Sequence, residues 1–503
     1  MEAIFSRLEL IHGADPALIS DSAETFTRSA LAGRCSALAE MLRREGLSVV
    51  ALHLDNRPDW IVIDLACQMA AACLVPLPTF FSPEQLGHVL GSIPVDAVFT
   101  DRPDLLAPLC AGRMRPGPEL SIGGCTLLRL QPVASASALP QNSGKVTFTS
   151  GSTGRPKGVC LDNRQLWTQA EALAEASGLE RPRHVCLLPL STLLENVAGV
   201  YAPLLAGGEV FVPSLAAIGF EGSSTLDPRR FLGLLSKLQP HSIILTPQML
   251  QLLVTAAGKG WVPPASLRFV AVGGARVPPL LLDAAQVRGI PAFEGYGLSE
   301  CASVVSLNVP GDNRPGSCGR PLPHLRVETV DGEIVVSGNA MLGYAGEPAS
   351  WGRRQIATGD LGFLDDDGFL HVDGRKKNLL ISSYGRNIAP EWVESEALAD
   401  GALAECLVFG DARPCCVALL TPRDPGAGDA AIQLSIDRCN ARLPDYARIR
   451  RWQRLAQPLA ASRDLLTENG RPKRLAVEAR YREVIEGLYG DDLVTNERYL
   501  RTA

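Results

Sequence analysis

A chain of 503 residues has room for roughly two to four folding units, and with 46% apolar and 20% charged residues it can bury a core in each. Its formal net charge of −6 excludes a general electrostatic interaction with nucleic acid. Thirteen cysteines without CxxC spacing predict reduced, buried thiols rather than a disulfide framework or a zinc site. Residues 1–16 carry no basic-then-apolar signal, so we expect a cytoplasmic protein.

Helical and β-rich segments alternate along the chain up to residue 370. The most apolar region, 60–78, is interrupted by Asp64, Gln68 and Pro76, which predicts a buried helix followed by a strand and no transmembrane segment. Other helices are expected at 25–44, 84–90 and 228–238, and strands at 47–54, 96–100, 185–190, 208–213, 242–247 and 268–274. This alternation predicts layered α/β subdomains with a substantial parallel sheet.

The pattern changes between residues 326 and 372, where two DG turns each separate alternating strands and predict β-hairpins. The basic stretch DGRKKN at 373–378 then precedes a new α+β pattern that closes with a helix at 478–489. We therefore expect a large N-terminal α/β domain (1–374) that includes a small β-barrel-like hairpin region. A hinge (375–378) and a small, mobile α+β C-terminal domain (379–503) follow it.

The segment VTFTSGSTGRPKGV at 146–159 concentrates hydroxyl residues, glycines and Lys157 directly after a β-like run. Glycines let backbone N–H groups converge on an anion, hydroxyls donate to phosphate oxygens, and the lysine adds positive charge. The GxxxxGK[ST] pattern of NTPase P-loops is absent. The segment therefore indicates a polyphosphate loop of another kind, and the alternative is a surface turn held by its own side chains.

Five motifs in order resemble the adenylate-forming enzymes, which include acyl-CoA synthetases, luciferases and peptide-synthetase adenylation domains. The phosphate loop is the first, and the others are VGGA (272–275), EGYGLSE (294–300), ATGDLG (357–362) continuing into GRKKN (374–378), and LTENGRPKR (466–474). With the flanking patterns, the resemblance covers nearly the whole chain. It implies an AMP-forming acid–thiol ligase that uses ATP and Mg²⁺ to join a carboxylic acid to CoA or to a carrier-protein phosphopantetheine.

The resemblance also implies roles for residues around the triphosphate. Glu300 binds Mg²⁺, with Thr149 as a second metal contact, and Ser299 touches the α-phosphate in place of the family's threonine. The β- and γ-phosphates lie against Thr149, Ser150, Gly151, Ser152, Thr153, Gly154 and Lys157.

A second set of residues is implied at the nucleoside and the thiol. Asp360 accepts hydrogen bonds from both ribose hydroxyls, and Arg375 approaches the ribose or the phosphates. Lys377 is the hinge residue, and Gly385 leaves room for the pantetheine arm. The adenine lies against Gly273, Gly274, Ala275, Tyr296 and Gly297, although Tyr296 could equally be a core tyrosine.

The late motif departs from the family pattern, in which a glycine directly precedes the catalytic lysine. Here Gly470 precedes Arg471, and Lys473 follows two residues later. We expect Lys473 to be the catalytic residue, and Arg471 is the alternative. Because arginine does not reproduce the geometry of an ammonium group, a chain that lacks the lysine would activate its acid slowly.

The segment 187–208 lies where the family shapes its acyl pocket. It contains no aspartate for an α-ammonium group, which disfavours amino acids, and it has Thr192 and Glu195 where long-chain enzymes have histidine and glutamate. Leu193, Leu194, Val197 and Tyr201 either line a tunnel or belong to a helix core.

These features favour a fatty acid first and an aryl acid second, with CoA as the acceptor. Transfer to a carrier protein is the alternative. A catalytically impaired nucleotide-binding regulatory protein is the alternative of another class.

Overall fold

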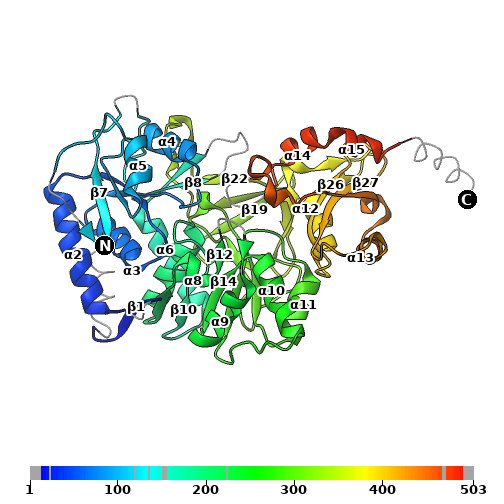
Figure 1. The fold of residues 1–503 in the computed structure, drawn as a ribbon, viewed down its shortest axis with the longest axis horizontal. Coiled ribbons are helices and arrows are strands. Elements are labelled where there is room, and N and C mark those ends of the chain that lie inside the picture. Colours follow the sequence, from blue (N-terminus) through cyan, green and yellow to red (C-terminus); the bar gives the residue numbers. More distant parts are fainter. Residues whose placement is uncertain are drawn as a thin grey trace, which may run out of the picture.

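The computed structural model describes residues 13–21, 24–117, 121–133, 136–149, 156–221, 225–466 and 472–490 (Figure 1). In it, the segments from blue to light green form a large body of stacked sheets and helices, and the yellow-to-red segments form a smaller body beside it (Figure 1). The mixed α/β architecture with a large N-terminal and a smaller C-terminal part is the one expected from the sequence.

A mostly parallel sheet, which we call the first sheet, forms the lower half of the large body. Its inner strands β16, β15, β14, β10, β11 and β1 pair in parallel, while β18, β17 and β2 add antiparallel edges. In sheet order the strands are β18 (Arg320–Pro321), β17 (Ser306–Leu307), β16 (Ala292–Tyr296), β15 (Phe269–Val272), β14 (Ser242–Leu245), β10 (Arg183–Val185), β11 (Glu209–Val212), β1 (Pro16–Ser20) and β2 (Thr25–Thr27).

The second sheet combines a parallel centre with antiparallel edges. Strands β8 and β9 form an antiparallel pair in which Thr149 is the partner of Lys157, so the predicted phosphate loop connects two paired strand ends. In sheet order the strands are β21 (Gly343–Tyr344), β9 (Lys157–Leu161), β8 (Lys145–Thr149), β4 (Cys73–Pro76), β3 (Val49–His53), β5 (Ala97–Thr100), β7 (Cys125–Arg129) and β6 (Ser121–Ile122).

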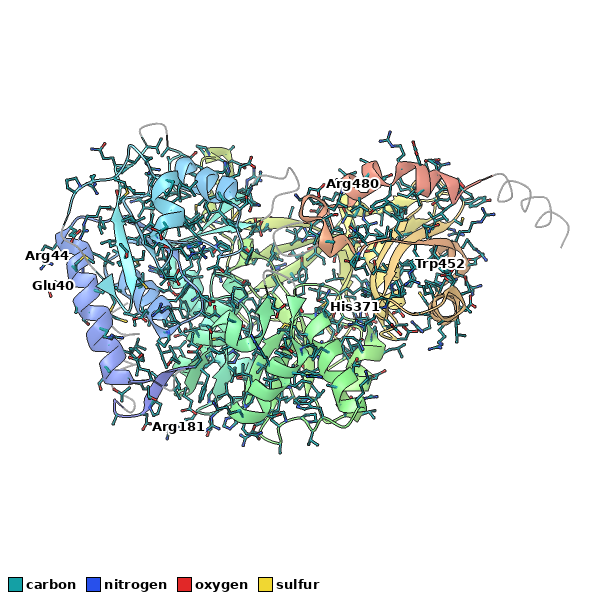
Figure 2. The ribbon with its side chains drawn as sticks, in the orientation of Figure 1. Glu40, Arg44, Arg181, His371, Trp452 and Arg480 are labelled. Carbon is teal, nitrogen blue, oxygen red and sulfur yellow. The ribbon has the colours of Figure 1, made fainter. Side chains whose placement is uncertain are left out.

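Helices cover both sheets, and their amphipathic patterns decide which side faces the core. Helix α2 begins after its N-cap Thr27, buries Leu31, Cys35, Leu38 and Leu42, and directs Glu40 and Arg44 to solvent (Figure 2). The helices of the large body are α2 (Arg28–Arg44), α3 (Pro58–Met69), α4 (Pro83–Ser92), α5 (Pro103–Leu109), α6 (Asn163–Ser177), α7 (Ala202–Leu205), α8 (Leu215–Ile218), α9 (Pro228–Leu238), α10 (Pro247–Gly258) and α11 (Pro279–Val287).

Two observations refine the expected elements of the large body. The expected strand at 185–190 is wrong for most of its length, because β10 ends at Val185 and the chain continues without regular structure to residue 192. The buried helix and strand expected at 60–78 are α3 and β4, and no described helix combines the length and the apolarity that crossing a bilayer requires.

A buried polar network joins the helix layer to the second sheet. Lys145 Nζ lies 2.9 Å from Asp64 Oδ1, and both side chains are at most 1% exposed. Tyr201 donates a hydrogen bond to Asp64 Oδ2 (2.5 Å) and accepts one from Lys145 (2.9 Å). The amide of Asn196 also connects Lys145 to Asp64. Because Lys145 begins β8, this network fixes the strand that leads into the phosphate loop.

The two DG turns form the expected hairpins in an antiparallel sheet of four described strands. Asp331 and Gly332 both adopt positive φ at the first turn, as a tight hairpin turn requires. The strands are β19 (Arg326–Val330), β20 (Glu333–Ser337), β22 (Gln355–Leu364) and β23 (Leu370–Arg375). A 3₁₀ turn at Lys376–Asn378 follows β23, within the region that we predicted as a hinge.

The C-terminal part has its own apolar cores, built only from residues 380 onward. A sheet of β26, β27 and β28 packs between α12 and α13 on one side and α14 and α15 on the other. The bounds are β24 (Leu380–Ile381), β25 (Asn387–Ile388), α12 (Pro390–Leu398), β26 (Leu403–Phe409), β27 (Cys416–Pro422), α13 (Asp429–Arg442), β28 (Ile449–Arg454), α14 (Arg474–Arg480) and α15 (Arg482–Gly487). The expected closing helix is thus two short helices that meet at Tyr481.

All thirteen cysteines lie in the described ranges, and each is buried and unpaired. Burial raises the pKa of most of these thiols, among them Cys35, whose pKa is raised to about 12. The prediction that these thiols are buried is therefore confirmed.

Candidate active site

A cleft of about 3000 Å³ lies between the large body and the C-terminal part. Its walls combine the carboxyl ends of strands β8, β15 and β16 with the hairpin strands β22 and β23 and with the start of α14. Parallel strands place their carboxyl ends at one edge of a sheet, and ligands of α/β proteins collect there. Most of the predicted site residues that the structure describes line this one cleft.

At the end of the cleft where the sequence predicts phosphate binding lie Thr149, which ends β8, and Lys157, which begins β9. Lys157 Nζ pairs with Glu347 Oε1 at 2.8 Å and lies 5.1 Å from the ring centre of Tyr344. The remaining predicted phosphate contacts lie outside the described residues; they are Ser150, Gly151, Ser152, Thr153 and Gly154.

Ser299 and Glu300 follow β16 in a short 3₁₀ turn and line the same cleft. The hydroxyl of Tyr344 donates a hydrogen bond to Glu300 Oε1 at 2.8 Å. Among the described residues no cationic side chain pairs with Glu300. A half-buried carboxylate without a cationic partner, close to a phosphate loop, fits Mg²⁺, which prefers one or two carboxylates together with phosphate oxygens.

The part of the cleft where the sequence predicts the ribose is built around Asp360, which is 4% exposed. Tyr296 donates a hydrogen bond to Asp360 Oδ2 at 2.6 Å, and Arg375 Nε lies 2.7 Å from Oδ1. Burial and the Asp360 charge raise the pKa of Tyr296, which keeps the phenol protonated as a donor. A carboxylate offers two oxygens and about four acceptor positions, a chemistry that suits a vicinal diol such as that of ribose.

The backbone beside Tyr296 leaves space that larger residues would fill. Gly273, Gly274 and Ala275 continue β15 into the cleft, and Gly274 has a φ of +85°. A Cβ atom at Gly297 would lie 1.7 Å from the carbonyl oxygen of Ser303, so only glycine fits there. Tyr296 lines the cleft and is not a plain core residue.

In the C-terminal part, Lys473 faces the cleft and Gly385 does not. Lys473 is the exposed N-cap residue of α14, and Arg471 lies outside the described residues. Lys377, in the turn after β23, also lines the cleft. Gly385 lies in the turn between β24 and β25 with a φ of +72° and has open space around its Cα. The chain is thus in an arrangement that presents the late motif to the cleft.

An apolar channel extends from the cleft along one face of the first sheet. Ala271, Ile244 and Phe269 form its sheet side. On its helix side lie small residues spaced four apart, namely Ala198, Ala202 and Ala206, and its far end is lined by Leu173, Ser177, Leu179 and Pro182.

The outcome for the residues expected to line a tunnel is mixed. Thr192, Leu193 and Leu194 line the cleft, whereas Val197 and Tyr201 are fully buried in the helix core. The helix changes to π geometry at Glu195–Tyr201, a local widening that is frequent at functional sites.

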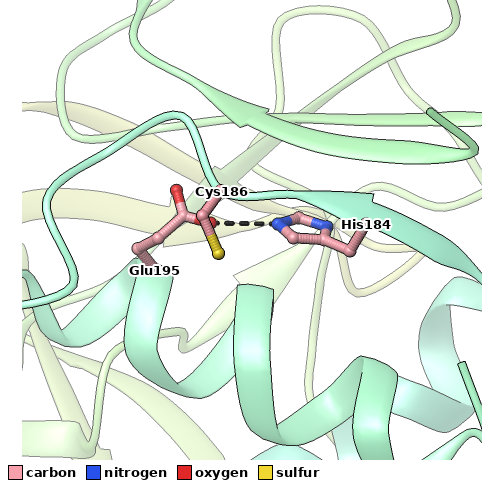
Figure 3. A group of neighbouring side chains, drawn as sticks. All are labelled: His184, Cys186 and Glu195. Atoms are coloured by element: carbon pink, nitrogen blue, oxygen red, sulfur yellow. Dashed lines mark hydrogen bonds and ion pairs between the residues drawn. The ribbon is translucent and has the colours of Figure 1, made fainter. Parts of the chain in front are cut away.

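Glu195 is fully buried behind the channel wall, where it lies beside His184 and Cys186 (Figure 3). His184 Nε2 lies 2.9 Å from Glu195 Oε1, and the backbone N–H of Leu188 donates to Oε2 at 2.9 Å. His184 Nδ1 is 2.9 Å from Ser242 Oγ. Because all these polar atoms have partners, the cluster anchors the π-helix to β10 and leaves the channel side apolar apart from His184 and Ser242.

Three features of the site were not expected from the sequence. Tyr344 contacts Glu300, and Glu347 pairs with Lys157. Both residues come from a segment that lies outside the five family motifs. Burial raises the pKa of Glu294, in the cleft wall, to about 7. Only the GY pair that forms β21 could have drawn attention to Tyr344, and it is too common a pair to do so alone.

The fold is that of adenylate-forming enzymes. Over 96% of its length the chain resembles the crystal structure of the anthranilate CoA ligase AuaEII in complex with anthranoyl-AMP, with a TM-score of 0.78, 20% identity and 97% of that chain covered. O-succinylbenzoate coenzyme A synthetase (MenE) from Bacillus subtilis, in complex with AMP, gives a TM-score of 0.71 at 23% identity. The match covers 94% of this chain and 97% of that chain.

The chain belongs to the family of AMP-binding enzymes: the family's main model matches residues 11–345, and the model of its C-terminal domain matches residues 377–492. Feruloyl-CoA synthase from Amycolatopsis sp is 30% identical over 76% of this chain and 80% of its own. Long-chain-fatty-acid–CoA ligase FadD15 from Mycobacterium bovis is 24% identical over 91% of this chain and 92% of its own length. The 2-succinylbenzoate–CoA ligase from Bacillus velezensis is 29% identical over 72% of this chain and 75% of its own length. The chain is an AMP-forming acid–CoA ligase.

Proposed function

We propose that this enzyme activates a fatty acid with ATP and transfers the acyl group to the thiol of CoA. In the first step a carboxylate oxygen attacks the α-phosphorus, and pyrophosphate leaves with the electrons of the broken P–O bond. In the second step the sulfur of CoA attacks the acyl carbon, its proton is lost to solvent, and AMP leaves.

Both partners of the first step are anions, so the site must neutralise charge and align atoms. We assign Thr149, Lys157 and the loop between them to the β- and γ-phosphates, and Ser299 to the α-phosphate. We assign Lys473 to the oxygens of the carboxylate and the α-phosphate. Glu300 would hold Mg²⁺, which would supply positive charge to offset the charge that develops on the departing pyrophosphate.

At the nucleoside, we assign the ribose hydroxyls to Asp360, which Tyr296 and Arg375 hold in place, and the adenine to the wall of Gly273, Gly274 and Ala275. Lys377 lies where a change in backbone conformation would rotate the C-terminal part. Such a rotation would exchange Lys473 for Gly385 at the cleft between the two steps.

The apolar channel is the observation that carries the assignment of a fatty acid. The residues that line the channel include Gly273, which follows the carboxyl end of β15, and Pro182, which precedes the amino end of β10. The lining therefore extends along the full length of the strands. A four-residue strand such as β14 alone measures about 13 Å. An extended apolar lining of this kind suits an alkyl chain, whose burial contributes about 0.8 kcal/mol per CH₂.

An aryl acid is the second candidate, and the similarity to feruloyl-CoA synthase and 2-succinylbenzoate–CoA ligase favours it. Pyrophosphate release from the purified enzyme with fatty and aromatic acids, each with and without CoA, separates the two. A preference for long-chain acids supports the proposal, and a preference for compact aromatic acids contradicts it. Comparing acyl transfer to CoA with acyl transfer to a holo carrier protein identifies the acceptor thiol. A nucleotide-binding regulatory protein would release no pyrophosphate with any acid.

The channel predicts that Ala202→Trp shortens the accepted chain. Ala202 is 5% exposed and lies on the channel's helix side, so an indole there fills the space that distal carbons need. We expect kcat/KM for long-chain acids to fall by about 10- to 200-fold while short acids keep their rate. Ala430→Trp on the exposed side of α13 is the control. An equal loss for short and long acids would show that the variant is merely misfolded or that the chain lies elsewhere.

The ribose assignment predicts that Asp360→Ala raises the KM for ATP far more than the KM for the acid. Hydrogen bonds to a charged group are worth about 1.5–3 kcal/mol each, so the KM for ATP should rise by about 10- to 150-fold for each ribose hydrogen bond that is lost. Steady-state kinetics with each substrate varied in turn measure this, and Asp283→Ala on the exposed side of α11 is a matched control. Equal changes in both KM values would count against the ribose role.

A further inference from the structure

We infer that Tyr344 is a positioning residue that holds the carboxylate of Glu300 in the orientation needed to bind the metal ion of the metal–ATP complex. This inference rests on the proposed function, in which Glu300 is the metal-binding carboxylate. It adds a residue that lies outside all five motifs and that acts through Glu300 rather than on a substrate.

The backbone of Tyr344 is fixed on several sides. Strand β21 pairs with β9, with Tyr344 opposite Val159, directly beside the strand that starts at Lys157. The Tyr344 N–H donates to Ser350 Oγ at 2.8 Å, and Trp351 Nε1 donates to the Tyr344 carbonyl at 2.8 Å. The side chain therefore projects from a rigid position.

Two contacts place that side chain between Glu300, the proposed metal ligand, and Lys157, a proposed phosphate contact. Its hydroxyl donates to Glu300 Oε1 at 2.8 Å, and its ring centre lies 5.1 Å from Lys157 Nζ. Glu300 follows β16 of the first sheet, whereas Lys157 begins β9 of the second. Tyr344 thus links two halves of the site that come from different sheets.

The chemistry of this contact explains why a phenol suits the position. A tyrosine hydroxyl has one proton to donate, so it binds one carboxylate oxygen and leaves the other for a cation. A phenol ordinarily titrates at about pH 10, so this proton stays in place at neutral pH. A carboxylate held in one rotamer loses less conformational entropy when the metal ion binds.

Tyr344→Phe isolates the hydroxyl, because it keeps the ring beside Lys157. We expect the Mn²⁺ concentration for half-saturation, measured by electron paramagnetic resonance with a non-hydrolysable ATP analogue, to rise roughly tenfold. Binding of the analogue without metal and the thermal midpoint should remain those of the unsubstituted enzyme. Tyr446→Phe, at an exposed tyrosine of the C-terminal part, is the matched control.

A double-mutant cycle with Glu300→Gln tests whether Tyr344 acts through Glu300. If it does, Tyr344→Phe weakens Mn²⁺ binding in the native background and has no further effect in the Glu300→Gln background. Independent effects, or a Tyr344→Phe variant that binds Mn²⁺ like Tyr446→Phe, would overturn the inference. Unchanged Mn²⁺ binding in Glu300→Gln would overturn it as well, by removing its premise, and acid-dependent pyrophosphate release would then decide separately whether the proposed function stands.

Discussion

We expect Lys473→Ala to abolish acid-dependent ATP–pyrophosphate exchange and Arg471→Ala only to weaken it. Lys473 is exposed, lies at the start of α14 and faces the cleft that contains Asp360 and Glu300. An ammonium group that stabilises charge developing between a carboxylate and the α-phosphate acts mainly in the transition state. Its removal should therefore cost about 10²- to 10³-fold in rate, as the loss of an oxyanion-stabilising donor does.

Exchange of labelled pyrophosphate into ATP, with saturating acid and metal, measures this loss directly. Lys259→Ala, at an exposed lysine after α10, controls for the loss of a surface charge. Lys473→Arg tests geometry, because a planar guanidinium keeps the charge without the shape of an ammonium, and we expect it to recover only part of the rate. If Arg471→Ala abolished exchange and Lys473→Ala only weakened it, the catalytic role would belong to Arg471.

The fold could be predicted from the sequence wherever local pattern decides structure. The hydrophobic periodicity of 228–238 gave α9 with its observed bounds, and the two DG turns gave both hairpins. The prediction failed at 185–190, where an apolar run reads as a strand. The chain leaves the sheet after Val185. The backbone N–H of Leu188 donates a hydrogen bond to Glu195, and that of Leu190 donates one to Asn56, instead of to a neighbouring strand. Such long-range polar contacts leave no periodic signal.

The candidate site could be predicted only as far as its motifs extend. The motifs identified Asp360, Tyr296 and Glu300, and the cleft contains all three. The partner that orients Glu300 could not be found, because Tyr344 is 44 residues distant in sequence and reaches it only through the pairing of β21 with β9. The roles that the motifs imply stay predictions for every site residue, and Arg471 and residues 150–154 also lie outside the described ranges.

The largest effect on stability is expected at the buried pair of Asp64 and Lys145. Asp64→Ala leaves the Lys145 ammonium in a fully buried position with no carboxylate beside it. Breaking a buried ion pair by removing one partner costs about 3–5 kcal/mol, so the free energy of unfolding should fall by that amount. Urea denaturation followed by tryptophan fluorescence measures the change, and Asp437→Ala on α13, in the C-terminal part, is the control.

The pH dependence of the Asp64→Ala variant tests the cause. Burial lowers the pKa of Lys145 in the folded chain, and Asp64 opposes this, so removing Asp64 lowers that pKa further. The unfolded chain then binds more protons than the folded one below the ordinary lysine pKa of about 10.4, and stability rises with pH in that range. The deficit of Asp64→Ala should therefore shrink as the pH is raised.

The double variant Asp64→Leu/Lys145→Met separates charge from packing. It removes both charges and keeps the volume apolar, and such replacements of buried ion pairs are often neutral for stability. We expect it to regain most of the stability that Asp64→Ala loses and to unfold without the added pH dependence. A double variant as unstable as Asp64→Ala would mean that the hydrogen bonds of Tyr201 and Asn196 in this network, rather than its charges, hold β8 against the helix layer.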